Sequence, residues 1–371
     1  MAEPIINQPI QSEERPPTLS VGPLGWARQN LFNTWYNALF TVLAIWVLWQ
    51  VIPPIIDWMF IDALWGAAPS DACRVEGVGA CWPFVHEKWR LIVFGLYPYD
   101  EQWRPTIAMI IAITLLIVSC TPKFWPYWRW LIAGWIVAWF VILMLMQGGV
   151  FGLEVVYTTR WGGLPLTVGL SVIGLVLAFP LSILLALGRR SNMPAIKTIC
   201  VAYIELIRGV PLITVLFMAS LLFPLFMPVG TDIDNLLRAQ IGLILFAAAY
   251  LAEVVRGGLQ AIPKGQYEAA DSLGLTYWQK TRLIVLPQAL RISIPPLVNT
   301  FIGFFKDTSL VIIIGLFDLL GAAKAALTDP AWRGFYKEAY IFTALLYFIF
   351  CFSMSRYSQH LEKRTNVGTR R

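Results

Sequence analysis

The chain has 371 residues, of which 58% are hydrophobic and only 13% are charged, and its formal net charge is +6. A soluble domain carries roughly 25% charged residues, so this composition excludes an ordinary soluble protein. The long apolar runs indicate a polytopic helical membrane protein embedded in a lipid bilayer. The 17 tryptophans fit the aromatic belts at membrane interfaces. Because the positive charge sorts by membrane side, nucleic-acid binding is not expected.

The first 37 residues are polar and contain prolines, which predicts a flexible tail without a cleavable signal peptide. Eight apolar stretches follow, each long enough to cross a bilayer as a helix. The fifth and seventh are long enough to be tilted, broken or extended beyond the lipid, and Pro211 and Pro224 can kink the fifth. The predicted spans cover about residues 38–56, 104–120, 130–147, 164–188, 198–228, 238–257, 291–320 and 338–356.

Charge fixes the orientation of these spans. With both ends of the chain in the cytoplasm, the cytoplasmic segments hold 17 Lys and Arg against 6 Asp and Glu, whereas the outside segments hold 9 against 13. An excess of Lys and Arg marks the cytoplasmic side, so cytoplasmic N- and C-termini are predicted. Cys73 and Cys81 then lie in an outside loop, residues 57–103, where a disulfide can form, with two unpaired thiols as the alternative. Their spacing supports no metal site.

The chain is expected to divide along its length. The predicted parts are a cytoplasmic polar tail, a three-span extension with the external loop, a five-span core and a basic tail, at residues 1–37, 38–160, 161–360 and 361–371. A polar loop, residues 258–290, lies on the predicted cytoplasmic side between the third and fourth spans of the core. No internal repeat at a fixed period supports an inverted-repeat secondary transporter.

This polar loop has the local signals of two short helices joined by a sharp turn. Pro263 suits the first turn of a helix, where its missing N–H costs nothing, and Gly274 can adopt the left-handed geometry that ends one. Thr276 and Gln279 fit a capping box that begins a second helix. Pro287 is expected to break or redirect that helix. We call the predicted structure the elbow.

Two interpretations of the elbow are open on physical grounds. The small side chains of Ala269 and Ala270 let a partner approach closely, and Glu268 offers a charge to it. A rigid helical lever can then transmit the partner's movement into the spans. Alternatively, Tyr277 and Trp278 suit an amphipathic helix that lies on lipid.

Residues 268–287 also resemble the signature of ABC-importer permeases, the EAA motif, which reads Glu-Ala-Ala, three residues, Gly, nine residues, Ile, one residue, Leu-Pro. The matching positions are Glu268, Ala269, Ala270, Gly274, Ile284, Leu286 and Pro287. The stretches 205–212, 253–262 and 306–310 are similar to the polar amino-acid uptake branch of that family. The three additional N-terminal spans resemble the larger permease subunit of general L-amino-acid importers.

The resemblance implies an all-α membrane protein with about eight transmembrane helices and a five-helix type I ABC-importer permease core. It implies a permease subunit in the bacterial cytoplasmic (inner) membrane that carries L-amino acids inward. The implied heteromeric complex contains a second permease subunit, two ATPase subunits that dock on the elbows and an external substrate-binding protein. The chain has no phosphate loop of the Gly-x4-Gly-Lys-Ser/Thr type, so it is not expected to be an enzyme or to bind a cofactor, and ATP and magnesium are expected in the partner ATPase.

Charged residues inside the predicted spans need a reason, because each costs at least about 2.5–3.5 kcal/mol in lipid. Glu205 with Arg208, and Glu253 with Arg256, are predicted i,i+3 pairs on one helix face. They are either structural pairs near the cytoplasmic interface or part of a pathway that holds the zwitterionic head group of an amino acid. The segment 306–309, with both charges and two hydroxyls, is the first pathway candidate. The candidate pathway residues are Glu205, Arg208, Glu253, Lys306, Asp307, Thr308 and Ser309.

Other functions are weighed against the amino-acid importer. An ABC permease for another small solute, such as an opine or a sulfur compound, would have the same elbow. An ion-coupled secondary transporter leaves the elbow unexplained, and uptake without ATP would favour it. A membrane enzyme is disfavoured, because no nucleophile–base constellation is visible in the sequence.

Overall fold

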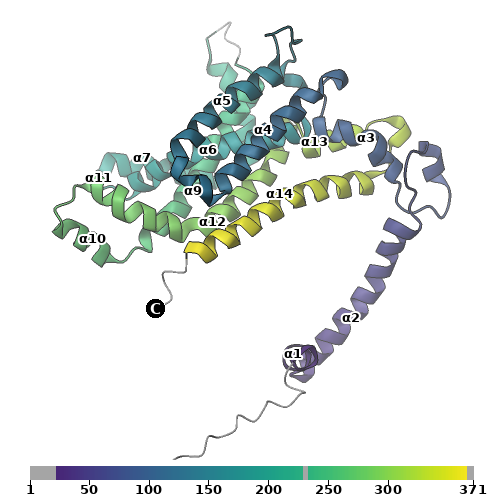
Figure 1. Ribbon diagram of the computed structural model, residues 1–371, viewed down its shortest axis with the longest axis horizontal. Coiled ribbons are helices and arrows are strands. Elements are labelled where there is room, and N and C mark those ends of the chain that lie inside the picture. The colour runs from purple at the N-terminus through teal and green to yellow at the C-terminus, as the bar shows by residue number, and fades with distance from the viewer. Residues whose placement is uncertain (1–21, 229–232, 366–371) are drawn as a thin grey trace, which may run out of the picture. The chain divides into compact units, whose positions relative to one another are not determined.

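The structure is a computed structural model that describes residues 22–228 and 233–365, and these fall into two compact units. The first unit consists of the described residues up to Trp65 together with the segment Asp71–Cys81. The second unit consists of the short segment Gly66–Ser70 and the described residues from Trp82 on. Nearly all regular structure is helical (Figure 1). The predicted boundary at about residue 160 stays a prediction. The helices of the first unit are α1 (Pro23–Asn30) and α2 (Trp35–Ile56).

The second unit contains twelve of the labelled helices among its described residues, and one short strand. Their bounds are α3 (Trp82–Phe94), α4 (Trp103–Cys120), α5 (Trp128–Gln147), α6 (Gly163–Arg189), α7 (Pro194–Gly209), α8 (Leu212–Phe217), α9 (Asn235–Gln260), α10 (Lys264–Ser272), α11 (Tyr277–Lys280), α12 (Leu286–Asp307), β1 (Phe317–Asp318), α13 (Leu319–Ala326) and α14 (Tyr336–Thr365).

In the first unit, α2 has no buried residue. A π-helical turn, Asp57–Ile61, extends it to an apolar helix of 27 residues. A helix that is hydrophobic all round, with no polar face, is suited to lipid rather than water. It corresponds to the first predicted span.

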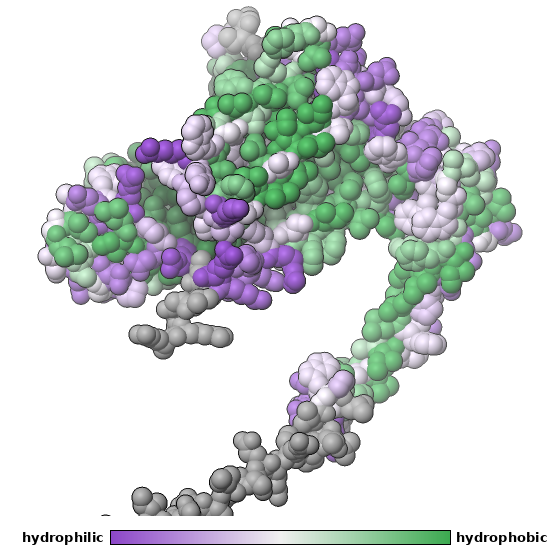
Figure 2. All heavy atoms as spheres, in the orientation of Figure 1, coloured by the Kyte–Doolittle hydropathy of each residue, from purple (hydrophilic) through white to green (hydrophobic). Residues whose placement is uncertain are grey.

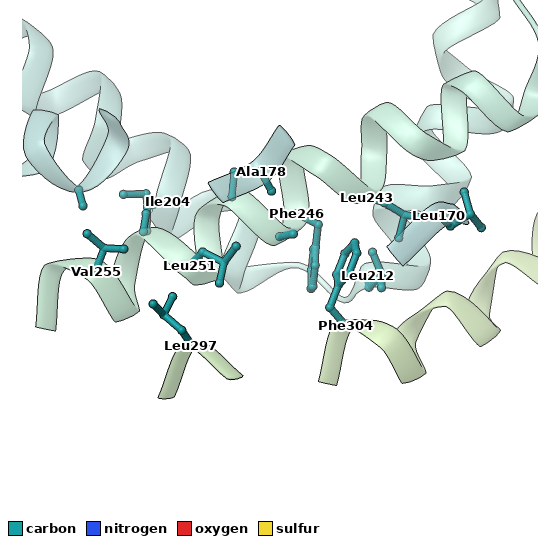
Figure 3. Close-up of a cluster of buried hydrophobic side chains, with 14 of the residues drawn as sticks. Leu170, Ala178, Ile204, Leu212, Leu243, Phe246, Leu251, Val255, Leu297 and Phe304 are labelled. Atoms are coloured by element: carbon teal, nitrogen blue, oxygen red, sulfur yellow. The ribbon is translucent and has the colours of Figure 1, made fainter. Parts of the chain in front are cut away.

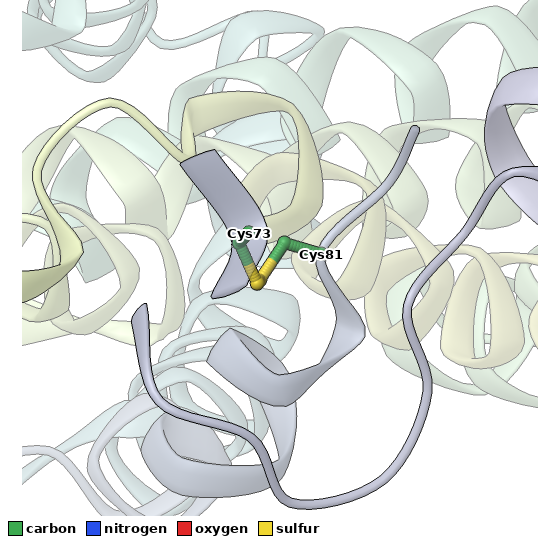
Figure 4. Close-up of a disulfide and its surroundings, with 2 residues drawn as sticks. All are labelled: Cys73 and Cys81. Carbon is green, nitrogen blue, oxygen red and sulfur yellow. A yellow bond between two sulfur atoms is a disulfide. The ribbon is translucent and has the colours of Figure 1, made fainter. Parts of the chain in front are cut away.

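A tight loop follows α2, and in it Cys73 and Cys81 form a disulfide (Figure 4). The N–H of Ala80 donates a hydrogen bond of 2.7 Å to the carbonyl of Trp58, so the chain folds back onto the end of the span. Gly79 allows this approach, because a Cβ atom there would lie 2.4 Å from the Trp58 carbonyl oxygen. The disulfide therefore closes a loop whose backbone is already paired with the helix end.

Seven helices among the described residues are long and apolar enough to cross a membrane, and one bent pair adds an eighth if its two helices count as one span. In that pair, α7 and the segment Leu212–Phe226 meet at an angle of 105°. The break lies at Pro211, which has no N–H to continue α7. Seven of the predicted spans and the kink at Pro211 are confirmed, and the predicted fifth span corresponds to the bent pair. Pro224 instead lies in a short 3-10 turn, Phe223–Phe226.

The core of the second unit is built around α9, which packs against α6, α7 and α12. Small residues make this packing close. At Gly258, a Cβ atom would lie 2.0 Å from the Ser293 hydroxyl oxygen and 2.5 Å from the Ala289 carbonyl oxygen, so α9 and α12 meet there almost backbone to backbone. Figure 3 shows the side chains that fill the core, which include Leu170, Ala178, Ile204, Leu212, Leu243, Phe246, Leu251, Val255, Leu297 and Phe304.

Large apolar side chains are also exposed along the spans of the second unit. In α4 and α5, Ile110, Ile117, Ile136 and Phe140 are all more than half exposed. Figure 2 shows hydrophobic residues over the face formed by α4 and α5, and hydrophilic residues gathered around the C-terminal end of α14. A face of this kind matches the lipid environment that the composition requires.

Helix α3, which lies within the predicted external loop, was not anticipated from the sequence. It belongs to the second unit and packs on α6, α13 and α14. Its Lys88 ammonium lies 2.7 Å from a carboxylate oxygen of Asp329. Burial opposes the charge on Lys88, but the hydrogen bonds from Lys88 to Asp329 and Glu87 outweigh it and raise the pKa of Lys88. The loop is thus partly an ordered cap on the core.

Asp318 organises the same end of the core. It is fully buried, and its carboxylate accepts hydrogen bonds from the N–H of Gly321 at 2.9 Å and from the Tyr347 hydroxyl at 2.9 Å. It therefore caps α13 and links it to α14. The N–H of Leu319 donates to the Thr167 hydroxyl of α6 at 3.0 Å. Burial raises the pKa of Asp318 despite these hydrogen bonds.

Replacement of this cap gives a first prediction. Asp318→Ala removes the acceptor for two backbone N–H groups and strands the Tyr347 hydroxyl, and it should destabilise the protein by about 1–2 kcal/mol. Asp318→Asn keeps a capping oxygen and should stay close to the wild type. Denaturant unfolding in detergent, followed by tryptophan fluorescence, measures both changes. Equal loss in the two variants would show that the charge, not the cap, matters.

Candidate functional site

The elbow has the predicted turn. Helix α10 ends at Ser272, and Gly274 follows with a φ of 68° in the left-handed region. The N–H of Gly274 donates to the Asp271 carbonyl at 2.9 Å, and the N–H of Leu275 donates to the Ala270 carbonyl at 3.3 Å. These two bonds use carbonyls that the end of α10 leaves open. The helix end predicted at Gly274 is confirmed.

The second helix begins as predicted. Thr276 caps α11, the N–H of Thr276 donates to the Gln279 side-chain oxygen at 2.9 Å, and the Gln279 N–H donates to the Thr276 hydroxyl. This is the reciprocal capping box expected from the sequence. An ion pair between Lys280 and Asp271 connects α11 back to α10. The turn is therefore fixed from both sides.

The expected break at Pro287 is wrong. The chain passes from α11 through a π-helical turn, Thr281–Val285, directly into α12, and the continuous helical stretch 277–314 has 38 residues. Pro287 lies in the first turn of α12, just after this wider turn, where its missing N–H removes no bond from the α-helical ladder. The elbow is thus continuous with a membrane span rather than separated from it by a break.

The signature residues of the elbow do not share one surface. Glu268, Ala269 and Pro287 are exposed, whereas Ala270 is fully buried and Ile284 and Leu286 are half-buried. Helix α10 packs against the π-helical turn, and the small Ala270 side chain suits that contact. Ala270 is therefore an internal residue of the elbow. The exposed apolar side chains beside the turn are Leu273, Tyr277 and Trp278.

A cluster of charges joins three core helices near their ends on the elbow side. Glu253 of α9 is its centre, and its side chain is 14% exposed. The Glu253 carboxylate lies 2.9 Å from the guanidinium of Arg189 in α6, 2.9 Å from that of Arg256 in α9 and 3.4 Å from that of Arg208 in α7. Three arginines around one carboxylate satisfy its charge where water is scarce.

The predicted pairing of Glu205 with Arg208 is wrong, whereas that of Glu253 with Arg256 is confirmed. The Glu205 carboxylate lies 2.8 Å from Arg189, at the end of the neighbouring helix α6. Arg208 lies near Glu253, and its guanidinium carbon is 5.5 Å from the ring centroid of Tyr250. Spacing along one helix could not reveal these partners, because they come from other helices.

The segment Lys306–Ser309 forms a second polar site, at the far end of α12. Lys306 is exposed, Asp307 and Ser309 are half-buried, and Thr308 is fully buried with its hydroxyl donated to the Phe305 carbonyl at 2.8 Å. Among the residues that the structure describes, the Asp307 carboxylate accepts no hydrogen bond and has no ion pair within 4.0 Å. A half-buried carboxylate without a hydrogen-bonded partner among these residues is a candidate for binding a cationic group.

The structure separates the predicted pathway residues into two groups. Ser293 of α12 lies beside Val254 of α9, with its hydroxyl donated to the Val254 carbonyl at 3.3 Å, and so marks the level of Glu253. Asp307 lies fourteen residues further along α12, which corresponds to about 20 Å at 1.5 Å per residue. Glu253 and Asp307 therefore belong to different levels of the bundle.

The sequence interpretation missed two residues of this region. Arg189 and Arg190 follow an apolar span and were counted only as positive charge on the cytoplasmic side. In the structure Arg189 joins two carboxylates of other helices, and Arg190 contacts α9 and α10. A pair of arginines directly at a span end was the only signal for either role in the sequence.

Comparison with known proteins agrees with this geometry. Residues 178–367 match the family described as binding-protein-dependent transport system inner membrane component. The inner membrane amino-acid ABC transporter permease protein YhdY of Escherichia coli K12 is 54% identical over 92% of this chain and 93% of its own. The glutamate/glutamine/aspartate/asparagine transport system permease protein BztC of Rhodobacter capsulatus is 39% identical over 94% of this chain and 95% of its own.

A solved amino-acid ABC transporter, crystallised with histidines, is 33% identical and covers 54% of this chain and 92% of its own, with a TM-score of 0.49. The chain belongs to the family of binding-protein-dependent transport system inner membrane components. The predicted all-α permease fold is thereby confirmed. The protein is a multi-pass membrane permease subunit.

The charge cluster gives a second prediction. Glu253→Ala leaves three guanidinium groups without their shared carboxylate and should destabilise the protein by about 2–3 kcal/mol. Glu205→Ala removes one contact of a side chain that is 56% exposed, and its effect should stay within about 1 kcal/mol. Denaturant unfolding in detergent compares the two variants. A Glu205 variant at least as destabilised as the Glu253 variant would contradict the assignment of Glu253 as the centre.

Proposed function

We propose that this chain is a transmembrane permease subunit of an ATP-driven importer that carries L-amino acids, mainly polar ones, into the cell. The observation that carries the proposal is the elbow: an ordered, polar helix–turn–helix, continuous with a span, in register with the permease signature. The names of the two relatives that match nearly the whole chain support an amino-acid substrate.

The proposed complex contains a second permease subunit, two ATPase subunits and an external binding protein. The ATPases dock on the exposed part of the elbow, around Glu268, Ala269 and the apolar side chains of Leu273 and Trp278. ATP and magnesium are held by the ATPase subunits, because this chain offers no phosphate loop. The permease transmits the movement of the ATPases to the substrate pathway.

We further propose that the elbow and both termini face the cytoplasm. The distribution of Lys and Arg supports this orientation. Within the second unit, the Tyr357 hydroxyl of α14 donates a hydrogen bond of 2.9 Å to the Cys120 carbonyl at the end of α4. This contact supports the same side of the membrane for the C-terminal part of α14 and for the turn between α4 and α5. Asp318 and α3 then lie at the outer end.

The test of the proposed function is uptake by the complex that co-purifies with this chain. Proteoliposomes that contain this complex, with its binding protein added outside and ATP enclosed, should accumulate labelled L-glutamate or L-glutamine only when ATP is present. Uptake at the same rate without ATP would instead show a secondary transporter. ATP-driven uptake of an opine or a sulfur compound, but of no polar amino acid, would contradict the substrate class.

The second polar site, Lys306–Ser309, gives a third prediction. Because the Asp307 carboxylate is open to a substrate ammonium and Ser309 lies beside it, Asp307→Asn combined with Ser309→Leu should lower uptake at least about tenfold. Both residues lie far from the elbow, so the ATPases should co-purify in the wild-type amount. The matched control is Thr300→Leu, a half-buried hydroxyl residue of the same helix whose hydroxyl donates to the Pro296 carbonyl. Wild-type uptake by the double variant would exclude this site from the pathway.

A further inference from the structure

Arg190, at the C-cap of α6, joins three parts of the second unit. Its Nη1 donates a hydrogen bond of 2.8 Å to the carbonyl of Leu259 in α9 and one of 3.1 Å to the hydroxyl of Tyr267 in α10. The Tyr267 hydroxyl in turn donates to the Leu259 carbonyl at 3.2 Å, and the guanidinium carbon lies 5.7 Å from the Tyr267 ring centroid. The three groups form a closed triangle, which we call the Arg190 joint.

The sequence explains why this carbonyl is free to take part. In a continuing helix, the Leu259 carbonyl would accept from the N–H of the residue four positions later. That residue is Pro263, which has no N–H. Leu259 is also buried, so its carbonyl needs another donor. Arg190 supplies it, and its positive charge is favourable beside the C-terminal end of α9.

The joint holds the elbow against the core. Helix α10 otherwise packs on α11 and the π-helical turn, which are parts of the elbow and the start of its own span. A second polar link joins Gln266 to Gln288, which also lies on that span. The Arg190 joint is different because it reaches the ends of α6 and α9. The preceding residue, Arg189, binds Glu205 and Glu253, so two adjacent arginines of α6 contact the elbow and the charge cluster.

We propose that Arg190 is a positioning residue that couples movement of the elbow to α6 and α9, with Tyr267 as its partner on the elbow side. This inference rests on the proposed function, because the movement it transmits is that of docked ATPases. A guanidinium suits the task, since it donates to two acceptors in a fixed geometry while its face lies against an aromatic ring. Without the Arg190 joint, the elbow can still dock an ATPase. The docked ATPase then moves α10, which no longer contacts the ends of α6 and α9 through Arg190.

The experiment measures the number of amino acids imported per ATP hydrolysed in proteoliposomes that contain the full complex. Arg190→Ala should lower this ratio about tenfold, within the range of allosteric coupling, while ATP hydrolysis and ATPase co-purification stay within about twofold. Tyr267→Phe keeps the ring and one bond of Arg190, so a loss of about twofold is expected. Arg190→Lys should recover part of the ratio, because it keeps the charge but not the paired geometry. Lys197→Ala, which removes an exposed charge from α7, is the matched control and should behave as the wild type.

A second readout does not depend on transport. Lys264 begins α10 and is exposed, so release of α10 from the joint should speed tryptic cleavage after Lys264 severalfold in Arg190→Ala, but not in Lys197→Ala. An unchanged ratio and an unchanged cleavage rate would overturn the joint. A loss of uptake and ATP hydrolysis in equal proportion would also overturn it, because that result indicates a structural role alone. ATP-independent uptake by the wild type would refute the proposed function, and the cleavage rates would still decide whether Arg190 holds the elbow.

Discussion

One carboxylate in a bundle of apolar helices sets the arrangement of the elbow side of the core. Glu253 brings arginines from α6, α7 and α9 to a single point. A carboxylate with little access to water is tolerated only when it is paired and hydrogen-bonded, so these helices cannot slide independently without breaking contacts. The small residues of α9 bring the backbones close enough for this to happen, as Gly258 shows against α12.

The elbow continues this arrangement beyond the ends of the core helices. Its turn is fixed by local rules, which are a left-handed glycine and a capping box, whereas its attachment to the core depends on one proline and one arginine. Pro263 has no N–H, so the Leu259 carbonyl lacks its helical donor, and Arg190 donates a hydrogen bond to it instead. Two adjacent arginines at the end of α6 therefore have different partners. Arg189 binds the charge cluster, and Arg190 binds the elbow.

Local features were predictable from the sequence, and features that depend on other helices were not. The spans, the kink at Pro211 and the capping box of Thr276 each follow from residues close together in the chain. The partner of Glu205 was missed because Arg189 lies on another helix. The predicted break at Pro287 was wrong because a π-helical turn places this proline in the first turn of α12, where its missing N–H removes no hydrogen bond from the helix. The link from Asp318 to α14 could not be anticipated, since its partner Tyr347 is distant in sequence.

The most direct test of the account is cross-linking between this chain and the ATPase that co-purifies with it. A single cysteine at exposed Glu268, in a background with Cys120, Cys200 and Cys351 changed to serine, should form a cross-link to the ATPase whose yield changes when ATP is added. A cysteine at Arg333, beyond the opposite end of the core, should form none. Cross-links from position 333 but not from position 268 would contradict both the docking role of the elbow and its orientation in the membrane.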